Sequence, residues 1–204
     1  MPLYKKIFID NSDIAVWRID EDESFFTSGL EGLPEIQNEN KRLQWLASRY
    51  LANEILGSHA QIVKDDQGKP WLKDSAHHIS ISHTMKFAAV IMNASSPVGV
   101  DMEMVNPKVD RIAYKFLQAD EIASINANEK VEKLILYWSA KESLYKLYGN
   151  GGIEFKTQLL IAPFELKSSG ELNAQITGIP EEINNLKIHY EFFDGHVFTY
   201  VVGR

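Results

Sequence analysis

Short stretches of alternating apolar residues recur along the chain and predict antiparallel strands. Residues 3–10 and 14–19 flank a turn-like Asp-Asn-Ser-Asp segment and predict a pair of strands. Further strands are predicted at residues 61–64, 78–82, 87–92 and 98–105. Near the C-terminus, strands are predicted at residues 159–161, 172–177, 187–193 and 197–202.

Two longer segments carry apolar residues at helical spacing. Residues 34–56 predict a long helix, and Gly57 supplies a plausible stop at its C-terminal end. Residues 128–148 predict a second long helix, which ends at the glycine-rich residues 149–152. Shorter helical stretches are predicted at residues 111–116 and 120–126.

Each half of the chain therefore combines several strands with one long helix. The tripeptide Ser95-Ser96-Pro97 is the clearest break between the two halves. We predict an α+β protein of two similar-sized lobes in a pseudo-twofold arrangement, each a small, mainly antiparallel sheet packed on a long helix. The lobes are expected to span residues 1–97 and 98–204.

Composition narrows the possible functions. The 204 residues include 28 acidic and 21 basic side chains, which argues against a broad basic face for nucleic acid. There is no cysteine, so disulfides, thiolate metal sites and cysteine nucleophiles are excluded. The longest apolar run, residues 87–92, is far shorter than the ~20 residues of a membrane helix, and the N-terminus lacks the apolar block of a signal peptide. We therefore expect a cytoplasmic protein without a membrane partner.

The segment Gly-Val-Asp-Met-Glu at residues 99–103 carries the first candidate chemistry. Alternate side chains of a strand share a face, so Asp101 and Glu103 are expected to point the same way. The residues expected to face the core are Val100, Met102 and Met104. The two carboxylates start about 6.5 Å apart, which suits one hard cation such as Mg²⁺. The alternative is a half-buried strand with an acidic, solvated face.

The second long helix places a further carboxylate, that of Glu142, among apolar side chains. At about 100° per residue, Glu142 falls within an apolar stripe of the helix. The stripe consists of Val131, Leu134, Ile135, Trp138 and Tyr145. A buried carboxylate needs a partner or a metal. Lys146 offers an ordinary helix pair four residues on, and a magnesium site shared with Asp101 and Glu103 is the other interpretation.

Basic residues on the same helix are candidates for phosphate binding. Lys141 and Lys146 lie about 140° apart around the helix axis and flank Glu142. Both lysines are therefore expected to reach a phosphate held by the same metal.

Other candidate residues lie in the first half of the chain. Lys69 sits in the turn Gly68-Lys69-Pro70, where glycine and proline restrict the backbone and aim the side chain. Ser82 and His83 end a predicted strand, and a histidine buried in the core is the alternative for His83. Lys41 and Arg42 begin the first long helix, where exposed basic residues usually have no special role.

Together, these motifs resemble the paired signature of the 4′-phosphopantetheinyl transferases. The pair consists of residues 99–103 and of Trp-Ser-Ala-Lys-Glu-Ser-Leu-Tyr-Lys at residues 138–146. Gly-Lys-Pro at 68–70 and Ile-Ser-His at 81–83 match two further motifs of the family in the right order. The length resembles that of the monomeric Sfp-like branch, in which two related lobes form one chain.

The resemblance implies transfer of the phosphopantetheine arm of coenzyme A to a serine of an acyl or peptidyl carrier protein, releasing 3′,5′-ADP. By similarity, Asp101, Glu103 and Glu142 hold Mg²⁺ against the pyrophosphate. Glu142 accepts the serine proton, directly or through a water. The residues that contact coenzyme A or its phosphates by similarity are Lys69, Pro70, Ser82, His83, Lys141 and Lys146.

The chain departs from the family pattern in two places. Ser80 stands where the family often has asparagine. Family members tend to carry basic residues in the N-terminal lobe that reach the 3′-phosphate. No Lys or Arg occurs here between Arg18 and Lys41, so this role falls to Lys41 or Arg42, or is performed in another way. Two other functions stay open: a non-catalytic relative that binds coenzyme A or a carrier protein, and an unrelated magnesium phosphohydrolase.

Overall fold

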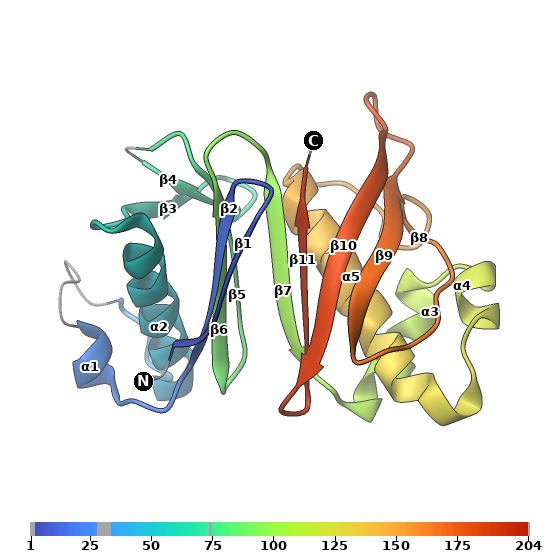
Figure 1. Ribbon diagram of the computed structural model, residues 1–204, viewed down its shortest axis with the longest axis horizontal. Coiled ribbons are helices and arrows are strands. Elements are labelled where there is room, and N and C mark those ends of the chain that lie inside the picture. Colours follow the sequence, from blue (N-terminus) through green and yellow to red (C-terminus); the bar gives the residue numbers. More distant parts are fainter. Residues whose placement is uncertain (1–2, 28–33, 74, 204) are drawn as a thin grey trace. The chain divides into compact units, whose positions relative to one another are not determined.

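The computed structural model describes residues 3–27, 34–73 and 75–203 (Figure 1). Antiparallel strand pairs and helices combine in an α+β fold, which confirms the predicted class. The chain divides into two compact units, Met1–Val98 and Gly99–Arg204. The pseudo-twofold relation between two lobes stays a prediction.

The N-terminal unit contains a four-stranded sheet in the order β1-β2-β6-β5. Its strands are β1 (Leu3–Ile9), β2 (Ser12–Arg18), β5 (His78–His83) and β6 (Phe87–Asn93). Each strand pair is antiparallel, and β6 is buried along its whole length. A separate hairpin joins β3 (Ile62–Lys64) to β4 (Pro70–Leu72), and β4 was not predicted.

The long helix α2 (Glu39–Leu56) packs on this sheet and buries Leu46 and Leu51. It begins five residues later than predicted, because Asn38 caps it by accepting a hydrogen bond from the Lys41 backbone N–H at 3.0 Å. Gly57 ends the helix with a left-handed φ of 68°, as its place in the sequence predicts. The short helix α1 (Glu23–Thr27) packs against α2.

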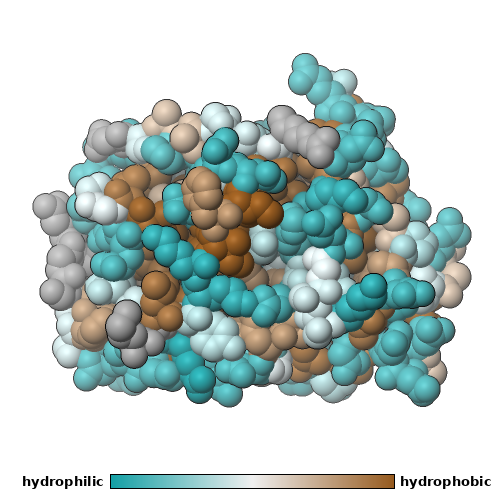
Figure 2. Space-filling view, in the orientation of Figure 1, coloured by the Kyte–Doolittle hydropathy of each residue, from teal (hydrophilic) through white to brown (hydrophobic). Residues whose placement is uncertain are grey.

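The C-terminal unit contains a five-stranded sheet in the order β7-β11-β10-β9-β8. Its strands are β7 (Val98–Met104), β8 (Leu159–Ile161), β9 (Ser169–Ile176), β10 (Ile183–Phe193) and β11 (His196–Val202). Its helices are η1 (Pro107–Ile112), α3 (Ala113–Phe116), α4 (Ala119–Ala123), η2 (Ala127–Glu129) and α5 (Lys130–Tyr148). The face of β9 and β10 turned away from α5 is hydrophilic, with Asn173 and Lys187 exposed on it (Figure 2).

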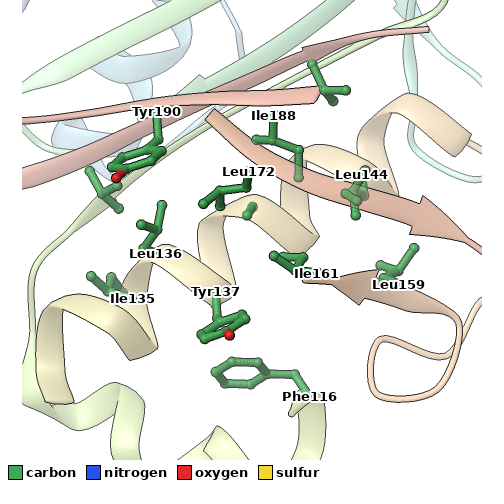
Figure 3. Close-up of a cluster of buried hydrophobic side chains, with 14 of the residues drawn as sticks. Phe116, Ile135, Leu136, Tyr137, Leu144, Leu159, Ile161, Leu172, Ile188 and Tyr190 are labelled. Atoms are coloured by element: carbon green, nitrogen blue, oxygen red, sulfur yellow. The ribbon is translucent and has the colours of Figure 1, made fainter. Parts of the chain in front are cut away.

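Helix α5 is buried on more than one side, since sheet residues lie on one side of it and Phe116 on another (Figure 3). Its most buried line of apolar residues is Tyr137, Ala140, Leu144 and Leu147. Of the predicted stripe, Leu134 and Ile135 are buried. The other members are only partly buried, as is Glu142: Val131, Trp138 and Tyr145. The prediction of a single amphipathic stripe was wrong, because the sheet covers one side of the helix and the Phe116 segment covers another.

Strand β7 also differs from its predicted orientation. Residues from Val98 to Met102, including Asp101, are buried, so both faces of the strand are covered. Met104 is 51% exposed and does not face the core, because the strand runs past the core at its end.

Helix α5 approaches β7 closely at Gly99. A Cβ atom on Gly99 would lie 1.9 Å from the Ser143 carbonyl oxygen, so only glycine fits. On the neighbouring strand β11, the Thr199 hydroxyl lies 2.9 Å from the Ser139 hydroxyl and 2.7 Å from the Ser143 hydroxyl. These buried hydroxyls and one glycine therefore set the position of α5 on the sheet.

We predict that Gly99→Ala destabilises the protein by about 1–3 kcal/mol or more, because the added methyl group meets helix backbone that cannot rotate away. Urea unfolding measures the change. Gly170→Ala is the control: the nearest atom to an added methyl group lies 3.1 Å away in the Tyr190 ring, so this contact is longer and involves a side chain instead of helix backbone. Equal losses in the two variants would contradict the close approach of α5 to β7.

Candidate functional site

Strand β7 and helix α5 bring Asp101 and Lys146 together. The Lys146 Nζ donates hydrogen bonds to Asp101 Oδ1 at 2.7 Å and to the Val100 carbonyl at 2.9 Å. Asp101 is 3% exposed, so this ion pair is largely shielded from water. The sequence suggested a helix pair between Lys146 and Glu142. The structure instead joins Lys146 to Asp101, while its charge still lowers the pKa of Glu142.

Glu103 is held by Trp138, which the sequence places both in the apolar stripe of the helix and at the start of the motif at residues 138–146. The Trp138 Nε1–H donates a hydrogen bond to Glu103 Oε1 at 3.0 Å. The Trp138 ring packs edge-on against Phe116 and stacks on Phe155, with ring centroids 5.2 and 5.6 Å away. Burial and the charge of Asp101 raise the pKa of Glu103, and the Trp138 hydrogen bond opposes the shift.

Glu142 lies on α5, one turn before Lys146. Burial raises the pKa of Glu142 to about 7, and the charges of Asp101 and Glu103 act in the same direction. A carboxyl group that titrates near neutral pH is suited to accept a proton in catalysis. Three carboxylates therefore act on one another electrostatically at the junction of β7 and α5.

Spacing and donor chemistry decide whether these three carboxylates fit a metal ion. Within residues 3–27, 34–73 and 75–203, no three or more Asp, Glu or His side chains are gathered tightly enough to hold one. The chemistry of the donors does fit a hard cation. Burial, and after it the charges of neighbouring carboxylates, raise the pKa values of Glu103 and Glu142, and a divalent cation would relieve the repulsion between these carboxylates. Coordination by Asp101, Glu103 and Glu142 stays a prediction.

Lys141 does not lie where the sequence analysis expected it. Its ammonium group is fully buried and donates to Glu121 Oε2 at 2.8 Å and to the carbonyls of Phe116 and Phe155 at 2.6 and 3.1 Å. All three N–H groups are thus used within the fold, which does not favour the expected contact with a phosphate. Helical geometry predicted the angle of Lys141 correctly but not the segments that cover it.

Arg42 is also engaged inside its own unit. Its Nε and Nη2 atoms bind the two carboxylate oxygens of Glu23 at 2.9 and 2.8 Å, and its Nη1 donates to the Ile36 carbonyl at 2.7 Å. Arg42 therefore fastens α1 to α2, which does not favour its expected role as a phosphate ligand.

The remaining predicted residues lie in loops and strand ends of the N-terminal unit. The Lys69 backbone N–H donates to Asp65 Oδ1 at 2.9 Å, and burial lowers the pKa of the half-buried Lys69 side chain. Pro70 is the first residue of β4. Ser82 is buried near the end of β5, and His83 ends the strand and is exposed, so the alternative of a core histidine is wrong.

Arg49 is a candidate residue that the sequence analysis missed. Its guanidinium carbon lies 4.3 Å from the centre of the Trp45 ring, and its Nη1 donates to the Ser48 hydroxyl at 3.1 Å. Its buried Nε–H has no acceptor among the described residues. Burial lowers the pKa of Arg49 to about 10. Trp45 and Arg49 are four residues apart on one helix face, a spacing that could have indicated the contact.

Comparison with known proteins identifies the family of this chain. Residues 97–201, slightly more than half of the chain, match the 4′-phosphopantetheinyl transferase superfamily. This stretch contains β7 and α5, with Asp101, Glu103, Glu142 and Lys146. The chain therefore belongs to this superfamily.

Individual relatives are distant. The 4′-phosphopantetheinyl transferase HetI of Nostoc sp. (strain PCC 7120) is 26% identical over 179 residues, which covers 74% of this chain and 75% of HetI. This match is longer than the C-terminal unit, so it extends into the N-terminal unit. The transferase AcpT of Escherichia coli (strain K12) is 24% identical over 115 residues, which is 53% of this chain and 59% of AcpT. The transferase Sfp of Bacillus subtilis is 30% identical over 112 residues, half of each chain.

We predict that Lys146→Met costs about 2–4 kcal/mol of stability, because it removes the ammonium group that offsets the buried Asp101 carboxylate. Lys130→Met is the matched control: its ion pair with Asp110 has the same 2.7 Å distance, but both side chains are about half exposed. This variant should lose less than about 1 kcal/mol in urea unfolding. Similar losses from both substitutions would argue against a shielded Asp101–Lys146 pair.

Proposed function

We propose that this chain transfers the 4′-phosphopantetheine arm of coenzyme A to a serine of an acyl or peptidyl carrier protein. The observation that carries this proposal is the Asp101–Lys146 ion pair beside Glu103 and Glu142, inside the region that matches the superfamily. A phosphohydrolase would have no evident need for the Gly-Lys-Pro and Ser-His motifs. A non-catalytic relative would not need to retain three carboxylates and a lysine at this junction.

The proposed reaction exchanges one phosphorus–oxygen bond for another. The serine Oγ forms a bond to the phosphorus that carries the pantetheine arm. The bond from that phosphorus to the bridging oxygen of the pyrophosphate breaks, and its electron pair leaves with 3′,5′-ADP. The serine proton passes to Glu142, directly or through a water. Such a transfer depends chiefly on positioning and charge neutralisation.

Asp101, Glu103 and Glu142 are the residues that would hold a divalent cation, Mg²⁺ in this proposal. When bound, the cation supplies positive charge to the pyrophosphate. The protein's own contribution is orientation: Lys146 holds Asp101 through its ion pair, and Trp138 holds Glu103 through its indole N–H. Lys146 also brings positive charge to the site.

We assign the nucleotide end of coenzyme A to the N-terminal unit, with Lys69, Pro70, Ser82 and His83 as its contacts by resemblance. Arg49 takes the place of Arg42 in this assignment. Its buried Nε–H and its lowered pKa both indicate a cation that an anionic ligand would stabilise. The Arg42 guanidinium, in contrast, already binds both carboxylate oxygens of Glu23.

Other parts of the proposal rest on the sequence alone. These are a monomer of two pseudo-twofold lobes, a cytoplasmic location, and the lack of nucleic-acid or membrane partners. Among the helices of the described residues, none is long and apolar enough to cross a membrane.

Intact-mass spectrometry of an apo carrier protein, incubated with this chain, coenzyme A and Mg²⁺, tests the reaction. We expect a mass gain of one phosphopantetheine that EDTA abolishes. Glu142→Gln should lower the rate about 100-fold or more while the protein stays folded, because it removes the proton acceptor. Glu132→Gln, an exposed position on the same helix, is the control and should keep full activity.

Other outcomes of this assay identify the alternatives. Coenzyme A binding without any mass gain across several carriers would favour the non-catalytic relative. Release of phosphate without carrier modification would favour the phosphohydrolase.

Arg49→Met tests the nucleotide assignment. We expect the Kd for coenzyme A to rise about 10-fold or more, because charge-assisted hydrogen bonds to a phosphate are lost. The Kd for 3′-dephospho-coenzyme A should change little, and calorimetry measures both. Arg42→Met is the comparison and should not discriminate between the two ligands. Equal weakening of both ligands by Arg49→Met would refute the assignment.

A further inference from the structure

The buried ion pair between Glu121 and Lys141 has no part in the chemistry proposed above. Their side chains are 5% and 0% exposed, and Lys141 Nζ lies 2.8 Å from Glu121 Oε2. Burying two charges costs several kcal/mol, which good geometry and further hydrogen bonds must offset. The contacts of the pair therefore show which parts of the fold it holds together.

Glu121 and Lys141 connect five segments of the C-terminal unit: α3, α4, α5, the loop after α5, and β8. Lys141, on α5, donates to the carbonyl of Phe116 at the end of α3 and to that of Phe155 in the loop after α5. Glu121, on α4, accepts the backbone N–H of Gln118 at 2.8 Å and that of Ile161 on β8 at 3.2 Å. Each member of the pair thus binds two backbone groups in addition to its partner.

The ion pair also touches residues that support the candidate site. Lys141 directly precedes Glu142 on α5. Lys141 binds the carbonyls of Phe116 and Phe155, and the rings of these two residues both pack against the Trp138 ring. The indole N–H of Trp138 in turn holds Glu103. Figure 3 shows Phe116 beneath α5, on the side away from the sheet residues Leu172 and Ile188. The pair thus contacts the supports of both Glu103 and Glu142.

We propose that Glu121 and Lys141 are positioning residues for the transfer reaction. Their ion pair fixes the Phe116 and Phe155 segments to α5, which holds Trp138 and therefore Glu103, and it anchors the helical turn that carries Glu142. This inference rests on the proposed function, because the placement of these carboxylates has a catalytic consequence only if the chain transfers phosphopantetheine.

Three variants separate positioning from stability: Glu121→Gln, Lys141→Met and the double variant. Each single substitution leaves one buried charge without its ion-pair partner, so both should lower Tm. The double variant removes both charges and should regain part of the lost Tm. Its kcat should nevertheless stay about 10-fold or more below that of the wild type, because the two segments have lost their anchor. The KM for coenzyme A should change less than about twofold.

Lys133→Met is the matched control. Lys133 is a buried lysine on the same helix, and its Nζ donates to the Ser124 carbonyl at 2.7 Å. Its removal should lower Tm through the loss of this bond while kcat stays close to that of the wild type. If kcat fell in the same proportion to the loss of Tm in Lys133→Met as in the double variant, the positioning role would be overturned.

Hydrogen exchange of the protein without substrates keeps this inference separate from the proposed function. Amides of residues 116–121 and 153–158 should exchange about 10-fold faster or more in the double variant, relative to amides of the N-terminal unit. If the wild type transfers nothing, the proposed function fails, yet faster exchange still supports the anchoring. A folded double variant with unchanged exchange, or with wild-type kcat, rejects the positioning role.

Discussion

The contact between Gly99 and the backbone of Ser143 sets where the functional side chains of the C-terminal unit lie. Gly99 stands two residues before Asp101, and Ser143 directly follows Glu142, so the approach of α5 to β7 also fixes the spacing of the carboxylates. A larger residue at position 99 would push the helix away from the strand. The buried hydroxyl groups around Thr199 then hold α5 along the sheet, where apolar contacts alone are less directional.

The same junction concentrates negative charge. Burial and the charge of Asp101 raise the pKa values of Glu103 and Glu142, and the charge of Lys146 opposes both shifts. Without a bound cation, the repulsion between these carboxylates lowers the stability of the fold. The same group is suited to binding positive charge. Sites of this kind are typical of enzymes, because the group that destabilises the fold is the one that the chemistry uses.

Residues of the same type have different roles in this protein because of what covers them. Lys141 and Lys146 lie on one helix, yet Lys141 is enclosed by carbonyl groups and Glu121, whereas Lys146 is partly exposed beside Asp101. Arg42 and Arg49 lie on one helix too, yet Arg42 binds Glu23 on both oxygens, whereas a buried Nε–H of Arg49 has no acceptor among the described residues. Charge and sequence position alone do not distinguish these cases.

From the sequence, most elements of this protein could be predicted, though not β4, and so could the motifs that place it in a superfamily. Most strand and helix positions follow from local periodicity, and helix α2 begins late only because Asn38 caps it. Tertiary structure alone decided the partner of Lys146, the burial of Lys141 and the exposure of Met104. The physical reason is that periodicity describes how one element faces its surroundings. The partners of a charge depend on segments that are distant in sequence, such as those of Phe116 and Phe155 around Lys141.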